Sequence, residues 1–204
     1  MKIIAKKDPR IHPQFKDLLT LPVLIRVNRI NEAAVTTFAQ EFENAHNTGQ
    51  PIVPIVIDSY GGEVYSLLSM IAIIENSNLP VATIGMGKSM SCGAVLLTCG
   101  TDGYRFMDED STVMIHDVSS FALGKVEDMK ARIGEAERLG KLLFQKMATN
   151  CGHRNENYFI KQIEKKKHVD WYLTAGVAKK HKIVDHIGVP DFHVNVSVDM
   201  EFKF

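Results

Sequence analysis

The 204-residue chain has no net charge, few cysteines and no long apolar run. Its 24 Lys and Arg residues balance 24 Asp and Glu, which argues against a nucleic-acid-binding protein that neutralises phosphates. The three cysteines leave one over and form no CxxC pair, so we expect reduced thiols in a cytoplasmic protein. The absence of an uninterrupted apolar stretch of about 18 residues predicts no membrane span, and residues 1–10 do not resemble a signal peptide.

What is present is an ordinary globular composition, 45% apolar and 24% charged. The length predicts one domain, which we place at residues 21–204. Residues 1–20 are polar and contain Pro9 and Pro13, so we expect a flexible N-terminal arm there.

Apolar periodicity predicts strands that alternate with helices, which indicates an α/β fold with a mainly parallel sheet. A pair of strands, 104–107 and 112–115, is expected around the polar turn at 108–110. The helix at about 125–149 is long and contains Gly134 and Gly140, each of which costs about 1 kcal/mol relative to Ala. We therefore expect tertiary or subunit packing to hold it. The other strands are expected at 23–27, 52–57, 81–84 and 193–198, and the other helices after Asn31 and Gly62 and at 91–99, 155–166 and 174–181.

Three separated residues could form a nucleophilic site. Ser91 lies at a glycine-flanked strand-to-helix junction, His116 follows a short apolar run, and Asp170 precedes an aromatic pair. A serine hydroxyl needs a base to remove its proton, and the base needs a partner that holds its tautomer. The upstream pair Gly61-Gly62 could supply backbone N–H groups for an oxyanion hole.

Short motifs in one order resemble those of the proteolytic subunits of the Clp protease, serine peptidases with a crotonase-like fold. The family's Asn-Ser-Pro-Gly-Gly motif corresponds to Asp58-Ser59-Tyr60-Gly61-Gly62. Its Ala-Ser-Met-Gly-Ala motif corresponds to Met90-Ser91-Cys92-Gly93-Ala94, and its Met-Ile-His-Gln-Pro motif to Met114-Ile115-His116-Asp117-Val118. Asp170 precedes Trp171-Tyr172-Leu173-Thr174-Ala175, as the family's third acidic residue precedes a similar run, and Lys182-Ile183-Val184-Asp185 resembles its Gly-Leu-Val-Asp signature.

The resemblance implies a fold of repeated β-β-α units with a protruding long helix. It also implies a serine endopeptidase that cleaves unfolded polypeptides through an acyl-enzyme on Ser91. His116 would be the general base, Asp170 would orient it, and the backbone N–H groups of Gly62 and Cys92 would form the oxyanion hole. The expected substrate-binding residues are Gly61, Val64, Phe121, Ala122, Leu123 and Gly124.

The resemblance further implies a homo-oligomer of two stacked heptameric rings, a tetradecamer, with ring-to-ring contacts on the helix from about Lys125. A AAA+ unfoldase of the ClpX or ClpA/ClpC type would feed it polypeptides. That partner would use the ATP, so the chain itself would need no cofactor and no metal.

The chain departs from the family motifs at several positions. Tyr60 and Val118 replace prolines, Cys92 replaces Met, and Lys182 replaces Gly. Because proline stiffens a turn, the loop at Tyr60 is expected to differ in shape.

Other interpretations of the same residues exist. Ser91 could be a helix N-cap, and the chain could be a catalytically inactive structural subunit of a mixed ring. Residues 82–89 satisfy a relaxed phosphate-loop pattern that ends in Lys88-Ser89, but the apolar run before it predicts a strand rather than an open glycine-rich loop. The simpler interpretation of Lys88 is a solvated charge on a loop. His181, Asp185 and His186 could be imagined as metal ligands, but a charged helix end is the simpler interpretation of these residues.

Overall fold

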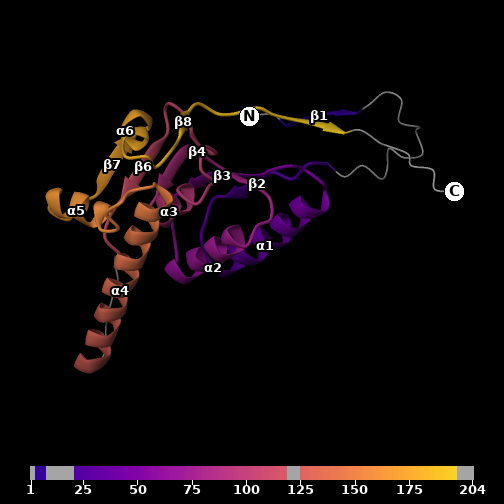
Figure 1. Cartoon of the computed structure of the whole chain (residues 1–204). Coiled ribbons are helices and arrows are strands. Elements are labelled where there is room, and N and C mark those ends of the chain that lie inside the picture. Colours follow the sequence, from indigo (N-terminus) through magenta and orange to yellow (C-terminus); the bar gives the residue numbers. More distant parts are fainter. Residues whose placement is uncertain (1–2, 8–20, 119–124, 197–204) are drawn as a thin grey trace.

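The computed structural model describes residues 3–7, 21–118 and 125–196, with side chains from 21 to 193 outside the gap. The sequence folds into a twisted sheet covered by helices, from which one long helix projects (Figure 1). The elements in chain order are β1 (Ile3–Lys7), β2 (Ile25–Val27), α1 (Glu32–Asn47), β3 (Val53–Ser59), α2 (Val64–Glu75), β4 (Val81–Met90), α3 (Cys92–Leu97), β5 (Arg105–Met107), β6 (Thr112–Ile115), α4 (Val126–Asn150), α5 (Tyr158–Lys165), β7 (Trp171–Thr174), α6 (Ala175–Lys180), β8 (His186–Ile187) and β9 (Phe192–Val196).

The main sheet is almost entirely parallel. Its strand order is β2-β3-β4-β5-β8, and β6 also pairs with β4. The pairing of β6 with β7 is antiparallel. The expected α/β fold with a mainly parallel sheet is therefore confirmed, and its helical crossovers follow from the parallel connections.

Both faces of the sheet bury apolar side chains, which explains the continuous apolar run of β3. Val53, Ile55 and Ile57 point to the larger core cluster, while Val56 belongs to a smaller cluster on the other face. Successive strand residues point to opposite faces, so a strand covered on both sides shows no polar alternation. The larger cluster includes Phe38 and Phe42 of α1, whose N-cap Asn31 accepts a hydrogen bond from the backbone of Ala34 at 2.9 Å, as expected.

The long helix α4 is buried only in its second half. Leu139, Leu143 and Met147 are among its buried residues, whereas Val126 and Ile133 near its start are 60% and 51% exposed. Figure 1 shows this first half projecting away from the sheet. The protruding helix is thus confirmed, and the described residues leave part of its apolar stripe uncovered.

Several expected elements differ in the structure. β5 and β6 do not pair with each other, because both lie parallel along the long β4, at residues 83–85 and 88–90. The prediction of a strand pair around 108–110 was therefore wrong in its pairing. A hydrogen bond from Asp108 N–H to the Gly85 carbonyl, 3.0 Å, and one from Gly87 N–H to Ser111 Oγ, 2.7 Å, hold the connecting turn against β4.

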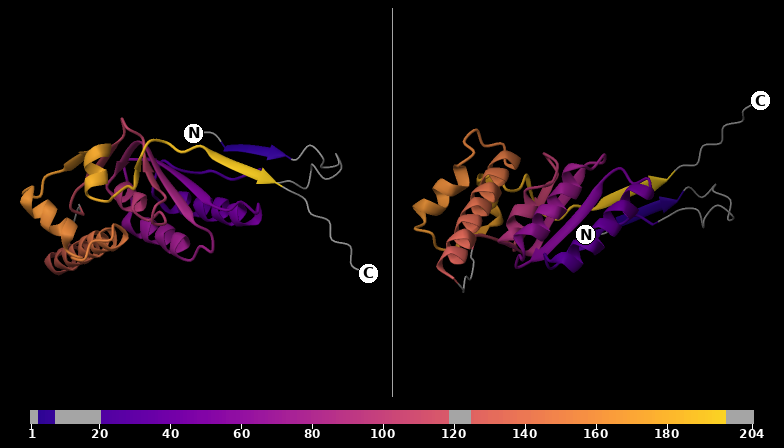
Figure 2. Two further views of the ribbon diagram at one scale, coloured as in Figure 1. Left: turned by 45° about the horizontal axis from the view of Figure 1, so that its top comes forward. Right: turned by 90° about the horizontal axis from the view of Figure 1, so that it is seen from below.

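β4 itself runs to Met90 rather than ending at Ile84, and the short strands β7 and β8 were not expected. Within the predicted arm, β1 pairs in parallel with β9 in a separate two-stranded sheet that extends beyond the main body (Figure 2). The flexibility expected for the rest of the arm concerns residues that lie outside the described part of the chain. The division into an arm and one domain at residue 21 stays a prediction.

Candidate active site

Ser91 lies where β4 ends and α3 begins, in an unusual backbone conformation. Its φ of 54° and ψ of −121° fall outside the ordinary regions for a residue with a side chain. A hydrogen bond from its N–H to the Met114 carbonyl, 2.8 Å, ties this junction to β6. Ser91 occupies the N-cap position of α3, as the alternative interpretation expected, but its side chain makes no capping hydrogen bond to the helix.

His116 follows β6 and faces this serine. Its Nε2 lies 2.8 Å from Ser91 Oγ, which is the distance that a general base needs to take the hydroxyl proton. β6 runs parallel beside the end of β4, with Met90 paired with Met114, so the two residues that follow these strands are brought together. The sheet register therefore creates the contact between residues 25 positions apart in the chain.

Asp170 precedes β7 on the side where His116 follows β6, but among the described residues the two side chains make no hydrogen bond or ion pair. In the antiparallel pairing of β6 and β7, Ile115 is opposite Trp171, so the next positions outward are His116 and Asp170. Asp170 is exposed, and among the described residues neither the hydrogen bonds nor the ion pairs join its carboxylate to the imidazole. The neighbouring Asp117 is paired instead with His168, whose Nδ1 lies 2.7 Å from its Oδ2.

The Gly61-Gly62 turn packs directly against the nucleophile. Gly61 has φ +104°, and a Cβ there would lie 2.8 Å from Ser91 Cβ and 2.9 Å from the Met90 carbonyl oxygen. A Cβ on Gly62 would lie 2.0 Å from the carbonyl oxygen of Ile30, which accepts a hydrogen bond from Glu63 N–H at 2.8 Å. Only glycines allow this close approach of backbone to serine.

Cys92 links the two sides of the same region. Its thiol donates a hydrogen bond to the Gly62 carbonyl, with Sγ 3.3 Å from the oxygen. Burial raises the pKa of this thiol, so it remains protonated and able to donate. The predicted oxyanion-hole residues, Gly62 and Cys92, therefore lie together beside Ser91.

A cavity of about 70 Å³ opens beside the serine and the imidazole. Apart from the site residues its lining is apolar, and three of those side chains come from the buried half of α4. The lining residues are Gly62, Val64, Ser91, Cys92, Val95, Ile115, His116, Val118, Gly140, Leu143, Phe144 and Met147. Such a space accepts an apolar side chain next to the reacting serine.

A wider groove of about 600 Å³ adjoins this cavity and shares Val118, Gly140 and Phe144 with it. Of the expected substrate-binding residues, Gly61 contacts the nucleophile and Val64, the first residue of α2, lines the cavity. Phe121, Ala122, Leu123 and Gly124 lie outside the described residues.

The phosphate-loop alternative is excluded by the backbone. Residues 81–90 form one continuous strand, and no open loop is present for a phosphate. Within residues 21–118 and 125–196, no group of three or more His, Cys, Asp or Glu residues could hold a metal ion. His181 instead bonds to Tyr158, with 2.7 Å between Nδ1 and the hydroxyl oxygen, and Asp185 binds Arg105.

Lys88, which was expected to be a solvated charge, contacts both Asp58 and Tyr60. Its Nζ lies 2.6 Å from Asp58 Oδ1 and 4.5 Å from the centre of the Tyr60 ring. The only signal in the sequence is that residues of opposite charge lie near the ends of two neighbouring strands, which is too common to identify a pair without the register.

The helices of the described residues include none long and apolar enough to cross a membrane. The Clp protease family matches residues 18–191 of the chain. A protein of Cyanophora paradoxa named ATP-dependent Clp protease proteolytic subunit is 35% identical over 135 residues, which cover 66% of this chain and 67% of that protein.

Proposed function

The chain belongs to the Clp protease family of serine-type peptidases, and from this premise we propose that it is a catalytically active endopeptidase subunit with Ser91 as its nucleophile. The observation that carries the proposal is the 2.8 Å contact between Ser91 Oγ and His116 Nε2. A serine in that contact, beside two closely packed glycines and an apolar cavity, has a base, a possible oxyanion hole and a place for a substrate side chain.

The proposed reaction is hydrolysis of a peptide bond in two halves. His116 Nε2 takes the proton from Ser91 Oγ as the oxygen bonds to the carbonyl carbon. The carbonyl oxygen becomes negative and accepts hydrogen bonds from the N–H groups of Gly62 and Cys92. The carbon–nitrogen bond then breaks, and His116 gives its proton to the leaving amine. Water, deprotonated by the same imidazole, releases the acyl group and restores the serine.

The proposed substrates are unfolded polypeptides with an apolar side chain before the cleaved bond. The apolar lining of the 70 Å³ cavity supports this preference. The main chain of the substrate would add as an extended strand along residues 119–124. The chain itself would need neither metal nor nucleotide.

The proposed assembly is two stacked rings of seven subunits in the cytoplasm, served by a AAA+ unfoldase that uses ATP. The exposed Val126 and Ile133 on the projecting half of α4 support a contact between copies, because isolated helices with uncovered apolar faces are seldom stable in water. Sedimentation that showed only monomer at every concentration and salt condition would contradict the assembly. Degradation of a folded, tagged protein at an unchanged rate without ATP and unfoldase would contradict the partner.

The test of the catalytic proposal is intact-mass analysis after incubation with a fluorophosphonate. We expect one adduct on the wild-type chain and none on Ser91→Ala, which should retain the wild-type assembly because the loss of one hydroxyl is a small structural change. His116→Ala should lose the adduct nearly as completely, since the members of such a unit act together.

A second candidate is a subunit that is inactive within a mixed ring. The exposed Asp170, without a bond to His116 among the described residues, favours it, because an imidazole without an orienting carboxylate is a weaker base. The absence of an adduct on a folded, assembled wild-type protein would support this candidate and contradict the first.

A further inference from the structure

We propose that Lys88 is a positioning residue that fixes the Gly61-Gly62 turn by binding Asp58 and Tyr60 on either side of Ser59. This inference rests on the proposed function, because it concerns how the oxyanion hole is held. Lys88 does not contact the reacting atoms in this scheme. It acts through the turn that carries the Gly62 N–H group.

The ammonium of Lys88 contacts both other side chains, of which Tyr60 is 74% exposed. The ammonium of Lys88 lies 2.6 Å from Asp58 Oδ1, and its charge lies over the ring of Tyr60, 4.5 Å from the ring centre. The side chain of Lys88 is only 26% exposed, and that of Asp58 is 47% exposed. The hydrogen bond to Asp58 raises the pKa of Lys88, so the charge that both contacts need is present at neutral pH.

These three side chains span the point where β3 leaves its regular pairing with β4. Ile57 pairs with Gly85, but Ser59 pairs with Ser89, so the register shifts between them. Asp58 is the residue at this irregularity, and Tyr60 is the first residue after the strand. Lys88 therefore connects β4, three residues before the nucleophile, to both ends of the segment that leads into the glycine turn.

The glycine turn needs such support because its own residues restrict the backbone little. Two consecutive glycines lose more conformational freedom on folding than other residues do. In the family motif a proline precedes them and limits φ, whereas here that position is Tyr60. Among the described residues, the N–H groups of the turn have one side-chain hydrogen bond, from Gly61 N–H to Ser59 Oγ at 3.1 Å. The bound Tyr60 side chain restrains the segment in place of the missing ring.

Movement of the glycine turn should affect the rate of acylation. The oxyanion hole works only if its N–H groups are already aimed at the developing charge, and a displacement of about 1 Å can cost about a hundredfold in rate. Loss of the Lys88 contacts should therefore slow acylation, while the apolar side chains of the cavity, which come mainly from α2, α3 and α4, still bind the substrate side chain. We expect a lower kcat with little change in KM.

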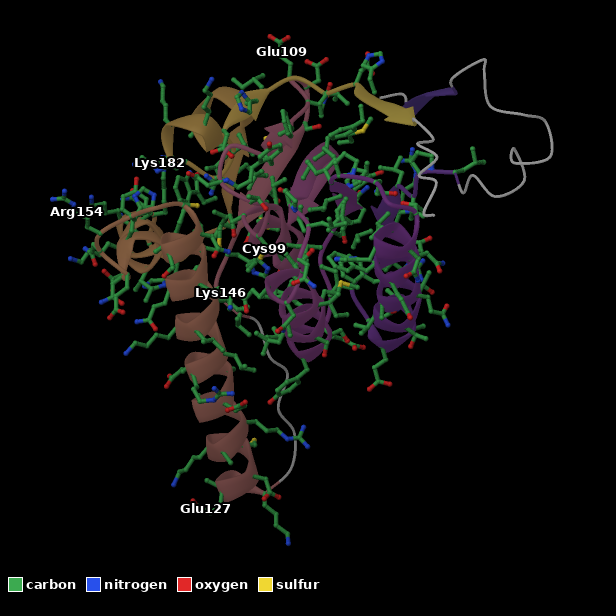
Figure 3. All side chains as sticks on the ribbon, turned by 45° about the vertical axis from the view of Figure 1, so that its right-hand side comes forward. Cys99, Glu109, Glu127, Lys146, Arg154 and Lys182 are labelled. Atoms are coloured by element: carbon green, nitrogen blue, oxygen red, sulfur yellow. The ribbon has the colours of Figure 1, made fainter. Side chains whose placement is uncertain are left out.

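The experiment compares Lys88→Met with Lys146→Met in the assembled, full-length protein. Methionine keeps an apolar side chain of similar length and removes the charge. Lys146 is a matched control, because its side chain is 24% exposed and it pairs with Glu75, but on the inner half of α4 (Figure 3). We expect Lys88→Met to lower the rate of fluorophosphonate labelling and the kcat for an apolar peptide by about ten- to a hundredfold, and Lys146→Met to leave both within about twofold of wild type.

Rescue by proline separates positioning from general damage. The N–H of Tyr60 makes no backbone hydrogen bond among the described residues, so Tyr60→Pro removes none of those bonds. We expect Tyr60→Pro in the Lys88→Met background to restore most of the lost rate, because it restrains the turn by another route. Hydrogen exchange of a peptide that covers residues 59–66, measured in Ser91→Ala protein, should be faster with Lys88→Met and slower again in the double variant.

The outcomes distinguish this inference from the proposed function. If the wild-type protein is not labelled, the proposed function fails, and the exchange measurement still decides whether Lys88 orders the turn. If the wild-type protein is labelled but Lys88→Met retains the wild-type rate and the wild-type exchange, the inference is overturned. A loss of rate that Tyr60→Pro does not restore, with unchanged exchange at 59–66, also overturns it.

Discussion

Replacement of Asp185 should destabilise the fold more than any other single loss of an ion pair among the described residues. Its carboxylate binds Arg105 three times, through the backbone N–H at 3.0 Å, Nε at 2.9 Å and Nη2 at 2.6 Å. Arg105 is only 2% exposed. The pair connects β5 to the segment before β8, so it fastens the last part of the chain to the sheet.

The magnitude follows from what remains after Asp185→Ala. The guanidinium would keep the carbonyl of Asn150, 2.6 Å from Nη1, and the exposed Asp102, 3.2 Å from Nη2. Removal of one partner of a buried ion pair costs about 3–5 kcal/mol, because the other charge stays buried. Since two partners remain here, we expect a loss of about 3 kcal/mol in the free energy of unfolding.

The assay is urea unfolding at fixed protein concentration, followed by the fluorescence of Trp171, the only tryptophan and a buried one. Glu127→Ala is the control, because it removes a pair with Lys130 at the exposed far end of α4 (Figure 3) and should cost less than about 1 kcal/mol. The double variant Arg105→Met with Asp185→Leu should recover much of the loss, since no buried charge is left without a partner.

The same pair predicts a pH dependence with a definite sign. Burial opposes ionisation of Asp185, but the hydrogen bonds and charge of Arg105 outweigh it and hold the pKa of this carboxyl below its usual value. The folded state therefore binds fewer protons than the unfolded state, and the stability from Asp185 is present above the unfolded pKa of about 3.9. This stability is lost as the pH falls through the lower folded pKa.

A loss below about 1 kcal/mol in the free energy of unfolding for Asp185→Ala at pH 7 would refute the reasoning about the ion pair.

Three further predictions concern other parts of the molecule. Gly140→Leu should fill the 70 Å³ cavity, so cleavage should shift toward small side chains before the scissile bond, as measured with a peptide library; an unchanged preference would place that side chain elsewhere. Burial lowers the pKa of His181, so the free energy of unfolding should fall as the pH drops below the unfolded pKa of about 6.5. The difference between urea unfolding curves at pH 7.5 and pH 5.5 should therefore be smaller for His181→Gln than for the wild-type protein. Cys151 is 2% exposed, and burial raises the pKa of its thiol to about 12, so iodoacetamide at pH 8 should modify it slowly in the native protein and rapidly in urea, whereas equal rates would show that it is accessible.

Local patterns were sufficient for most of the elements. The apolar run of β3, the cap at Asn31 and the stripe of α4 depend on neighbouring residues, and each appeared close to its expected position. The pairing of the strands could not be predicted from such local patterns. The strands at 105–107 and 112–115 look like neighbours in the sequence, but both use the edge of β4, and only the three-dimensional register decides between the two arrangements.

For the candidate site too, the sequence indicates the residue types, and the tertiary structure decides which of them are in contact. The identities of Ser91, His116 and the glycine pair were visible in the sequence, because a nucleophile, a base and a close backbone approach each demand particular residue types. Their roles in catalysis stay predictions until a labelling experiment is done. Only the tertiary structure brought Ser91 within 2.8 Å of His116. Among the residues that the structure describes, it shows no bond between Asp170 and that imidazole.

The sequence by itself therefore determined the family, the types of element and the residues able to do the chemistry, because these depend on side-chain type and short spacing. The tertiary structure alone decided which distant residues meet. It brought together Lys88 with Asp58 and Arg105 with Asp185. Such contacts depend on strand register and on the path of the whole chain, which no local pattern contains.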